Sequence, residues 1–322
     1  YQITNLTISN GGQYAGLFGY TEGAVIKNCN VTGEINGYNH TGGIVGYANN
    51  NTYILNCSFQ GNVEGNGEDK GGIVGHTSIG CDVSGCYVTG TVTGEKFVGG
   101  IAGWGVGTIK NCYALADVTA AGDNAAGYNA GGIAGYAYGV TIENCYYSGE
   151  VSASGSAGGI VGTAWGGTIQ NCVSLAESVT GSNANRIVGK SYKATLTNNH
   201  SYNRTQLVIN GEITYPTGGA GNDVNGADVY ISNGRVMTDV QKGEVFNWAG
   251  FDKDIWDIPK KAGKLPSLQK GTYPDLPNLP SKDLTIDQAP QHFTTKNIGN
   301  GFVVKVTSEG TLNESIEFTK EY

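Results

Sequence analysis

The sequence predicts an all-β protein: a parallel β-helix, or β-solenoid, of about seven to eight coils, right-handed as crossover connections usually are. Three observations support this prediction: a repeated glycine phrase, a second phrase that follows it, and a stretch of alternating apolar residues. The glycine phrase recurs about every 28 residues, a period typical of stacked units. Its seven copies are Leu17-Phe18-Gly19, Ile44-Val45-Gly46, Ile73-Val74-Gly75, Ile101-Ala102-Gly103, Ile133-Ala134-Gly135, Ile160-Val161-Gly162 and Ile187-Val188-Gly189.

The elements of one repeat follow in a fixed order. The glycine phrase predicts a short strand, whose glycine marks a sharp bend or a place without room for Cβ. The second phrase, Ile-x-Asn-Cys, begins at Ile26, Ile54, Ile109, Ile142 and Ile169 and predicts a strand followed by an asparagine corner. Alternation from Cys29 to Ile35 predicts a third strand with one buried face. Three strands this short need neighbouring units for a core, so we expect parallel ladders about 4.8 Å apart.

Six of the seven cysteines hold one position of the repeat, and Cys81 is the extra one. In-register parallel strands hold Cβ atoms about 5 Å apart, farther than a disulfide needs, so we expect a stack of small buried thiols. For Cys81 and Cys86, a disulfide that closes a small loop is the alternative. The sequence contains no Cys-x-x-Cys pair, the pattern that would indicate zinc, and its four histidines share no repeat position. No metal site and no cofactor are therefore expected.

The phrases Gly-Leu-Phe-Gly and Gly-Gly-Ile-Val-Gly, with Ile-x-Asn-Cys and Val-x-Gly-x-Val after them, resemble the GLUG-motif repeat proteins over residues 1–200. The segment Trp248–Leu268 is similar to one that commonly closes such arrays. The resemblance implies a bacterial surface or secreted protein, such as the adhesin-like proteins of gut Bacteroidetes or the non-catalytic repeats of streptococcal IgA-cleaving metallopeptidases. It carries no catalytic residues, and the His-Glu-x-x-His motif of those metallopeptidases is absent.

Two kinds of position are candidate ligand-binding sites. The residue after the fixed glycine is aromatic or histidine in five successive copies, which predicts a ladder along one side. These residues are Tyr20, Tyr47, His76, Trp104 and Tyr136. Such a row offers apolar faces to sugar rings, but it also stabilises a stack without any ligand. Loops that precede the Gly-Gly pairs leave one edge of the rod, and there Tyr38 and Tyr128 are the residues expected to touch a partner.

Outward carboxylates form a further candidate. Asp117, Glu150 and Glu177 lie five residues after successive ladder cysteines, so we expect them side by side on the outer face. Three such groups could bind Ca²⁺ or act as an acid/base group on a polysaccharide. The alternative is a solvated acidic face without chemistry.

The period fails after residue 200, and the prediction divides the rest into three parts. Residues 201–272 form a C-terminal cap with Trp248, Phe251, Trp256 and Leu265, and Thr238–Phe246 is a short helix. Residues 273–283, with three prolines, form a linker. Residues 284–322 form a small β-unit or begin a further domain, with strands at Phe302–Thr307 and Ser315–Thr319.

Composition limits the function classes. The net charge of −8 argues against a nucleic-acid partner. The sequence has no apolar run of about 18 residues, the length that a membrane span needs. The chain starts at Tyr1 and has no start methionine, so we expect it to be part of a longer, exported protein. The leading hypothesis is a non-catalytic, adhesin-like scaffold outside a bacterial cell, presenting loops and an aromatic stripe to a host or dietary glycan or a surface protein. The alternative is a carbohydrate-cleaving β-helix enzyme, a lyase or glycoside hydrolase, that uses the outward carboxylates.

Overall fold

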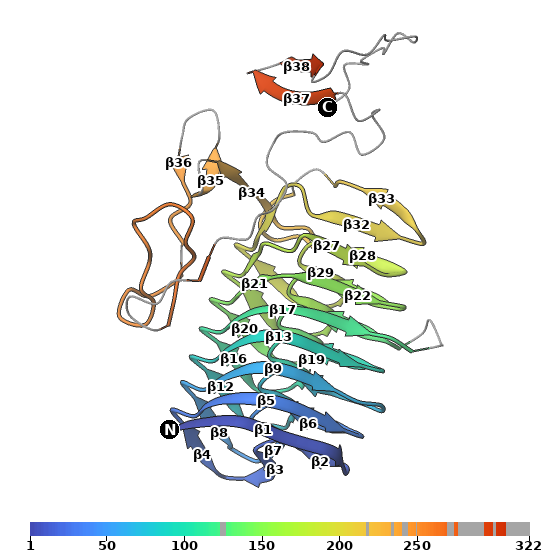
Figure 1. Cartoon of the computed structure of the whole chain (residues 1–322), viewed down its shortest axis with the longest axis vertical. Helices are drawn as coiled ribbons and strands as arrows, with labels where there is room; N and C mark the ends of the chain where they lie inside the picture. Colours follow the sequence, from blue (N-terminus) through green and yellow to red (C-terminus); the bar gives the residue numbers. More distant parts are fainter. Residues whose placement is uncertain are drawn as a thin grey trace. The chain divides into compact units, whose positions relative to one another are not determined.

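The computed structural model describes residues 1–122, 127–216, 219–232, 235–239, 244–248, 250–268, 274–275, 293–298 and 301–306. These residues form two compact units, Tyr1–Pro277 and Asn278–Tyr322. Every regular element among them is a β-strand. The first unit is a stack of parallel coils, so the prediction of a β-solenoid of seven to eight coils is confirmed (Figure 1).

Each complete coil places one strand, or a pair of short strands, in each of four parallel sheets, which we name A to D in chain order. Sheet A contains β1 (Gln2–Gly11), β5 (Asn30–Gly37), β9 (Ser58–Glu64), β13 (Tyr87–Gly94), β17 (Tyr113–Ala120), β21 (Tyr146–Ser148), β22 (Glu150–Ala153), β26 (Val173–Ser174), β27 (Ser178–Thr180), β31 (His200–Tyr202) and β32 (Gln206–Ile209). Sheet B contains β2 (Tyr14–Ala15), β6 (His40–Gly42), β10 (Lys70–Gly71), β14 (Phe97–Gly99), β18 (Asn129–Gly131), β23 (Ser156–Gly158) and β28 (Asn183–Asn185).

The other two sheets follow in the same coils. Sheet C contains β3 (Phe18–Glu22), β7 (Val45–Asn49), β11 (Val74–Thr77), β15 (Ala102–Gly105), β19 (Ala134–Tyr138), β24 (Val161–Trp165) and β29 (Val188–Tyr192). Sheet D contains β4 (Val25–Lys27), β8 (Tyr53–Leu55), β12 (Asp82–Ser84), β16 (Thr108–Lys110), β20 (Thr141–Glu143), β25 (Thr168–Gln170) and β30 (Thr195–Thr197). The expectation of three strands per coil is therefore wrong. The strands of sheet B, two or three residues long, are too short to show alternation.

Glycines bring opposite walls of the coil together. A Cβ on Gly43, at the Gly-Gly pair, would lie 2.2 Å from the ring of Phe59 in sheet A. A Cβ on Gly75, the fixed glycine, would lie 2.4 Å from the backbone nitrogen of Thr41 in sheet B. The fixed glycine is thus a position without room for Cβ, the second of the two roles expected for it.

The asparagine corners follow the prediction. Asn111, Asn144 and Asn171 adopt the left-handed conformation with φ between 52° and 53°, which asparagine tolerates better than most residues. The Asn144 amide donates to Asn111 Oδ1 at 3.3 Å, and the Asn171 amide donates to Asn144 Oδ1 at 3.2 Å. The side chains therefore bond coil to coil and help to keep the coils in register.

All seven cysteines are buried and free. The stack of thiols expected from the sequence is confirmed, and Cys81 and Cys86 are not bonded to each other. Burial raises the pKa of the Cys86 and Cys145 thiols well above the ordinary value. Thiols in this state are poor nucleophiles and act as small apolar groups in the core.

The end of the solenoid differs from the predicted cap. β34 (Ala227–Ser232) pairs parallel with β31 and extends sheet A, then pairs antiparallel with β35 (Arg235–Asp239). β35 in turn pairs with β36 (Glu244–Val245), and β32 pairs with β33 (Glu212–Thr214). The helix predicted over Thr238–Phe246 is wrong for the described part of that range, because Thr238 and Asp239 belong to a strand whose ladder supplies their backbone partners.

The predicted cap aromatics lie on the flank of the solenoid. Residues 244–248 and 250–268, which we name the return segment, run back beside the coils (orange in Figure 1). Trp248, Phe251 and Trp256 surround the Tyr146 ring, with centroids 5.7, 6.5 and 5.8 Å away. Tyr146 belongs to a stacked row with Tyr87 and Tyr113 on the outer face of sheet A. The return segment therefore covers a second aromatic row that the sequence analysis missed.

The second unit contains an antiparallel hairpin of β37 (Phe293–Ile298) and β38 (Gly301–Val306). β38 matches the predicted strand Phe302–Thr307 closely, but its partner precedes it in the chain. The other predicted strand, Ser315–Thr319, lies outside the described residues, as does most of the predicted linker 273–283.

Candidate functional site

The aromatic ladder predicted after the fixed glycine is present on sheet C. Parallel register places each ring on the one in the next coil. The ring centroids are 5.6 Å apart for Tyr20 and Tyr47, 4.6 Å for Tyr47 and His76, 5.6 Å for His76 and Trp104, and 4.5 Å for Trp104 and Tyr136. Tyr20 is 47% exposed and the other four are half-buried, so part of each stacked ring reaches solvent.

The aromatic surface continues beyond the predicted ladder. Tyr138, Trp165 and Tyr192 align in consecutive coils of sheet C, two residues further along their strands, and are 51%, 49% and 36% exposed. The Trp165 and Tyr192 rings lie 4.8 Å apart. We name the eight residues of both rows the aromatic band. The signal for the second row was present in the sequence as an aromatic residue two positions after the ladder position.

Sheet B supplies rings that support one edge of the band. Tyr14 stacks on His40, and His40 meets Tyr47 edge to face at 5.1 Å. Phe97 meets Trp104 edge to face, also at 5.1 Å. Aromatic pairs in these geometries hold one another in place beyond the effect of burial alone. Tyr47 and Trp104 are therefore held in place before any ligand arrives.

Polar groups lie beside the rings at the first coils. The Asn49 amide donates to the Tyr20 hydroxyl at 2.8 Å, and the Asn50 amide donates to Glu22 at 2.9 Å. Ser78 donates to Asn49 Oδ1 at 2.7 Å. Partly exposed aromatic rings and nearby hydrogen-bonding groups are two components that a sugar-binding surface combines.

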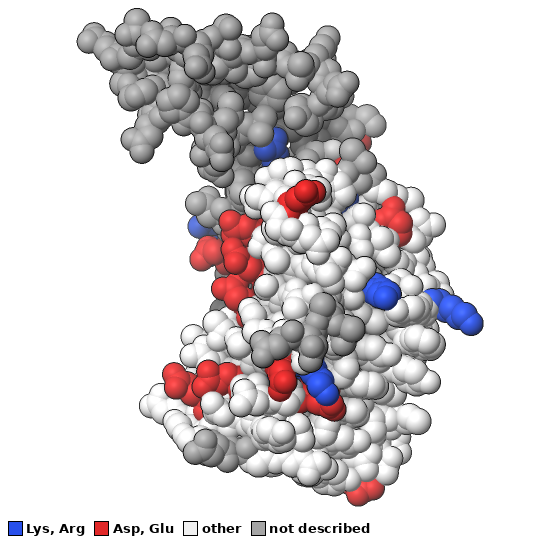
Figure 2. All heavy atoms as spheres, turned by 90° about the vertical axis from the view of Figure 1, so that its right-hand side faces the viewer, with Lys and Arg blue, Asp and Glu red and all other residues white. Residues whose placement is uncertain are grey.

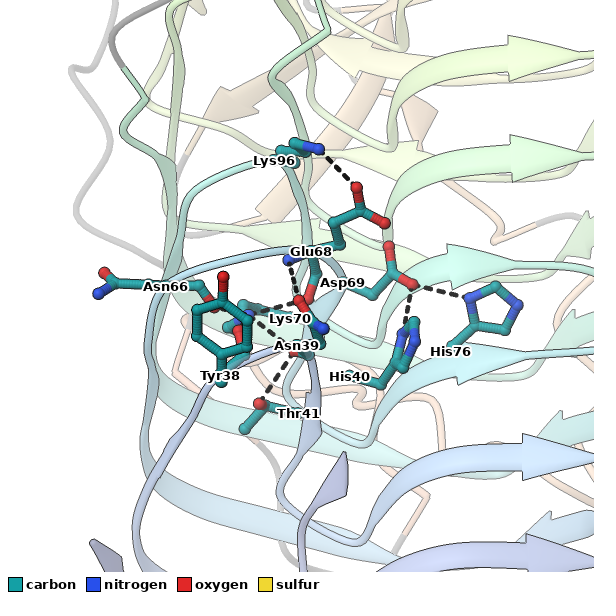
Figure 3. A network of polar contacts seen from close by, with 10 residues as sticks. All are labelled: Tyr38, Asn39, His40, Thr41, Asn66, Glu68, Asp69, Lys70, His76 and Lys96. Atoms are coloured by element: carbon teal, nitrogen blue, oxygen red, sulfur yellow. Dashed lines mark hydrogen bonds and ion pairs between the residues drawn. The ribbon is translucent and has the colours of Figure 1, made fainter. Parts of the chain in front are cut away.

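One charged cluster lies where sheets B and C meet. Nδ1 of His40 and Nδ1 of His76 each lie 2.7 Å from the same oxygen, Oδ2 of Asp69 (Figure 3). The Asp69 side chain is 1% exposed, and its other oxygen, Oδ1, is buried without a hydrogen-bond partner. Burial opposes ionisation, but the bonds from the two imidazoles outweigh it and hold the pKa of the Asp69 carboxyl below its usual value.

Comparison of the histidines within one repeat position does not reveal this cluster. His40 belongs to sheet B and His76 to sheet C, so they share none. Asp69 aligns with His40 in the next coil, since the residue after it, Lys70, pairs with Thr41. Comparing positions across two adjacent sheets would have found the group.

The edge loops differ from the expectation at one of their two residues. Tyr38 is 60% exposed and available to a partner. Tyr128 is only 8% exposed, because its ring packs against Gly122, where an added Cβ would lie 2.4 Å from the ring. The prediction that Tyr128 touches a partner is therefore not supported by its position.

Beneath the edge loops, Lys70 is fully buried. The three N–H groups of its ammonium are shared among four backbone carbonyl oxygens, those of Tyr38, Asn39, Asn66 and Glu68, at 2.7–2.9 Å (Figure 3). One cation thus ties the loops of two successive coils together next to the Asp69 cluster.

The outward carboxylates are exposed, as predicted, but they are not all in register. Val118 pairs with Val151, which aligns Asp117 with Glu150, whereas Glu150 pairs with Ser178 rather than Glu177. One additional residue between β26 and β27 causes this shift. Figure 2 shows acidic side chains gathered along one side of the face it presents. Among the described residues, the group with metal-ligand geometry is His40, Asp69 and His76, not these carboxylates.

Replacing Glu150 by glutamine is expected to raise the free energy of unfolding at pH 7 by no more than about 0.5 kcal/mol, since the group is solvent-exposed. Burial and the carboxylates of Asp117 and Glu177 raise the pKa of Glu150 in the folded chain. With a raised folded-state pKa, ionisation costs native stability above the unfolded value, so the gain is present at neutral pH and disappears below about pH 4.

Urea unfolding of wild type and E150Q at pH 7 and pH 3.5 measures this difference. Glu34 occupies the same register but lies between Thr7 and Asn62, so E34Q is the matched control and should change nothing. A less stable E150Q at pH 7 would show that this carboxylate makes a favourable contact.

Comparisons with known proteins support the β-solenoid fold and do not assign the chain to a family. No protein-family model matches the chain. The sequence is 35% identical over 168 residues to halomucin from Haloquadratum walsbyi, covering 47% of this chain and 2% of halomucin. The structure is similar to that of a putative immunoglobulin A1 protease from Bacteroides ovatus, with a TM-score of 0.51, 23% identity, and coverage of 75% of this chain and 77% of that one. At this identity the likeness concerns the fold alone.

The described residues contain no helical segment with the length and hydrophobicity that crossing a bilayer requires.

Proposed function

We propose that this chain is a non-catalytic scaffold of the GLUG-repeat type, located outside a bacterial cell, that binds carbohydrate along the aromatic band. The observation that carries the proposal is the band itself: eight partly exposed rings, five in one row and three in a second row, run along sheet C of the solenoid. Structural stacking alone would not require the exposure of Trp165 and Tyr138, which are about half exposed. The similarity to halomucin, whose name marks it as a mucin, supports a place at the cell surface.

The geometry favours extended sugar chains over small ligands. The rings repeat once per coil, about every 4.8 Å, along a surface rather than around a closed cavity. The stacked rings contribute apolar contact with little entropy loss, because their orientation is already held by their neighbours. A chain of sugar residues lying along the band would contact several rings at once.

Replacing Trp165 by alanine is expected to lower the affinity for a bound polysaccharide about tenfold, and W165A/Y138A about a hundredfold. The measurement is binding of the purified chain to a panel of host mucin glycans and dietary polysaccharides, with melting temperature recorded for each variant. The matched control is Tyr53→Ala, which removes a 40% exposed ring from sheet D, away from the band.

Three other results would contradict the proposal. A loss of polysaccharide affinity in Y53A as large as that in W165A would indicate nonspecific contact. Retained binding in W165A/Y138A would move recognition to the edge loops or to Tyr38. Release of reducing ends from any polysaccharide, lost in E150Q, would support the carbohydrate-cleaving alternative instead.

A further inference from the structure

We propose that His40, Asp69 and His76 form a binding site for a divalent first-row transition-metal ion of the Zn²⁺ class. His40 lies in sheet B, His76 lies in sheet C, and Asp69 directly precedes β10 of sheet B. One ligand atom from each lies within 4.8 Å of the others. This inference does not depend on carbohydrate binding: His76 also belongs to the aromatic band, but His40 and Asp69 do not.

The donor atoms already converge. Both Nδ1 atoms lie 2.7 Å from Asp69 Oδ2, and the three side chains point toward one another in Figure 3. Ligand atoms around a tetrahedral Zn²⁺ with bonds of 2.0–2.1 Å lie about 3.3 Å apart. To admit the ion, the site must therefore open by about 0.6 Å between ligands, and each imidazole must carry its proton on Nε2 so that the Nδ1 lone pair is free to bind.

The surroundings hold the ligands in place. The His76 ring stacks between Tyr47 at 4.6 Å and Trp104 at 5.6 Å. The His40 ring stacks on Tyr14 at 5.5 Å. Stacking fixes the plane of each imidazole, the role that outer-shell contacts play in metal sites. Little ordering remains to be done when the ion binds.

The Asp69 carboxylate is buried and has one oxygen without a hydrogen-bond partner, as expected for a metal ligand whose ion is not bound. Asp69 is 1% exposed, and its Oδ1 is buried without a partner, although buried carboxylate oxygens normally have one. A bound cation would compensate the buried charge.

The donor set selects the class of ion. Two imidazoles and one carboxylate suit Zn²⁺, Cu²⁺, Ni²⁺ or Fe²⁺, whereas Ca²⁺ and Mg²⁺ prefer oxygen ligands. Three protein ligands leave at least one coordination position open. His40 and His76 are 15% and 17% exposed, so that position has access to solvent beside the aromatic band.

Calorimetric titration of the full chain, purified without a histidine tag, with ZnCl₂ and separately with CaCl₂ tests the proposal. We expect one Zn²⁺ per chain, no binding of Ca²⁺ at the site, and a loss of Zn²⁺ affinity of at least about 100-fold in H76A and in H40A. The matched control is His200→Gln, which changes a histidine that packs against Phe246, away from the cluster. It should bind Zn²⁺ like wild type.

Absence of Zn²⁺ binding, or unchanged binding in both H40A and H76A, would overturn the proposal. Should either variant fail to fold, X-ray absorption of the Zn²⁺-loaded wild type still decides it. Nitrogen and oxygen ligands at about 2.0–2.1 Å with imidazole scattering are expected, while sulfur at about 2.3 Å would place the ion on cysteines and refute the site.

Discussion

Replacing Lys70 by methionine is expected to lower the free energy of unfolding by about 4 kcal/mol. Methionine fills a similar volume but donates no hydrogen bond, so the four carbonyl oxygens around the Lys70 ammonium lose their common donor in a buried place. The loss should be greatest in the loops that Lys70 ties together. Urea unfolding measures the free energy, and hydrogen exchange of residues 36–41 and 64–70 locates the loosened backbone.

The matched control for this variant is Lys96→Met. Lys96 forms an ion pair with Glu68 on the same edge, but both side chains are exposed, 39% and 46%. Pairs of this kind contribute at most about 1 kcal/mol. Equal effects of K70M and K96M would mean that the carbonyl cage around Lys70 adds nothing to stability.

Replacing Gly61 by alanine is expected to cost about 3 kcal/mol or more and to reduce the yield of folded protein. Gly61 has φ of +143°, and an added Cβ would lie 1.9 Å from the carbonyl oxygen of Gly33 in the preceding coil. The methyl group would therefore push two coils apart at the centre of sheet A. Thermal unfolding followed by circular dichroism measures the effect.

Alanine occupies the same register position in another coil. Gly61 pairs with Gly90, and Gly90 pairs with Ala116, whose φ is not positive. The matched control, Ala116→Gly, should cost only about 1 kcal/mol through added chain entropy. If G61A is as stable as A116G, the close approach of the coils is not what selects glycine.

The parts of the fold that could be predicted are those where one physical constraint acts in every coil. The position of Asn144 has a left-handed backbone, the fixed glycine Gly75 has no room for Cβ, and the ladder thiols are all buried at one position of the repeat. Repetition makes such constraints visible in a single sequence. Sheet B could not be predicted, because strands such as Lys70–Gly71 are held by the coils above and below rather than by any local pattern.

The candidate site was predicted only in part for the same reason. Tyr47 and Trp104 repeat at one position, so their stacking could be expected. The meeting of His40 with His76 depends on how closely sheets B and C approach at their corner, which spacing along the chain does not show. The covering of Tyr146 by the return segment likewise depends on a contact between residues more than 100 positions apart.

The four sheets have a consequence for how such a protein changes over evolutionary time. Each coil bonds to the coil before it and the coil after it, and the registers of sheets A to D are set separately at each step. Duplication of one repeat would insert one complete coil. It would separate one pair of neighbouring coils and leave every other pair unchanged. The row of exposed rings would grow by one position, so the length of surface available for contact can be adjusted in units of one coil without redesign of the core.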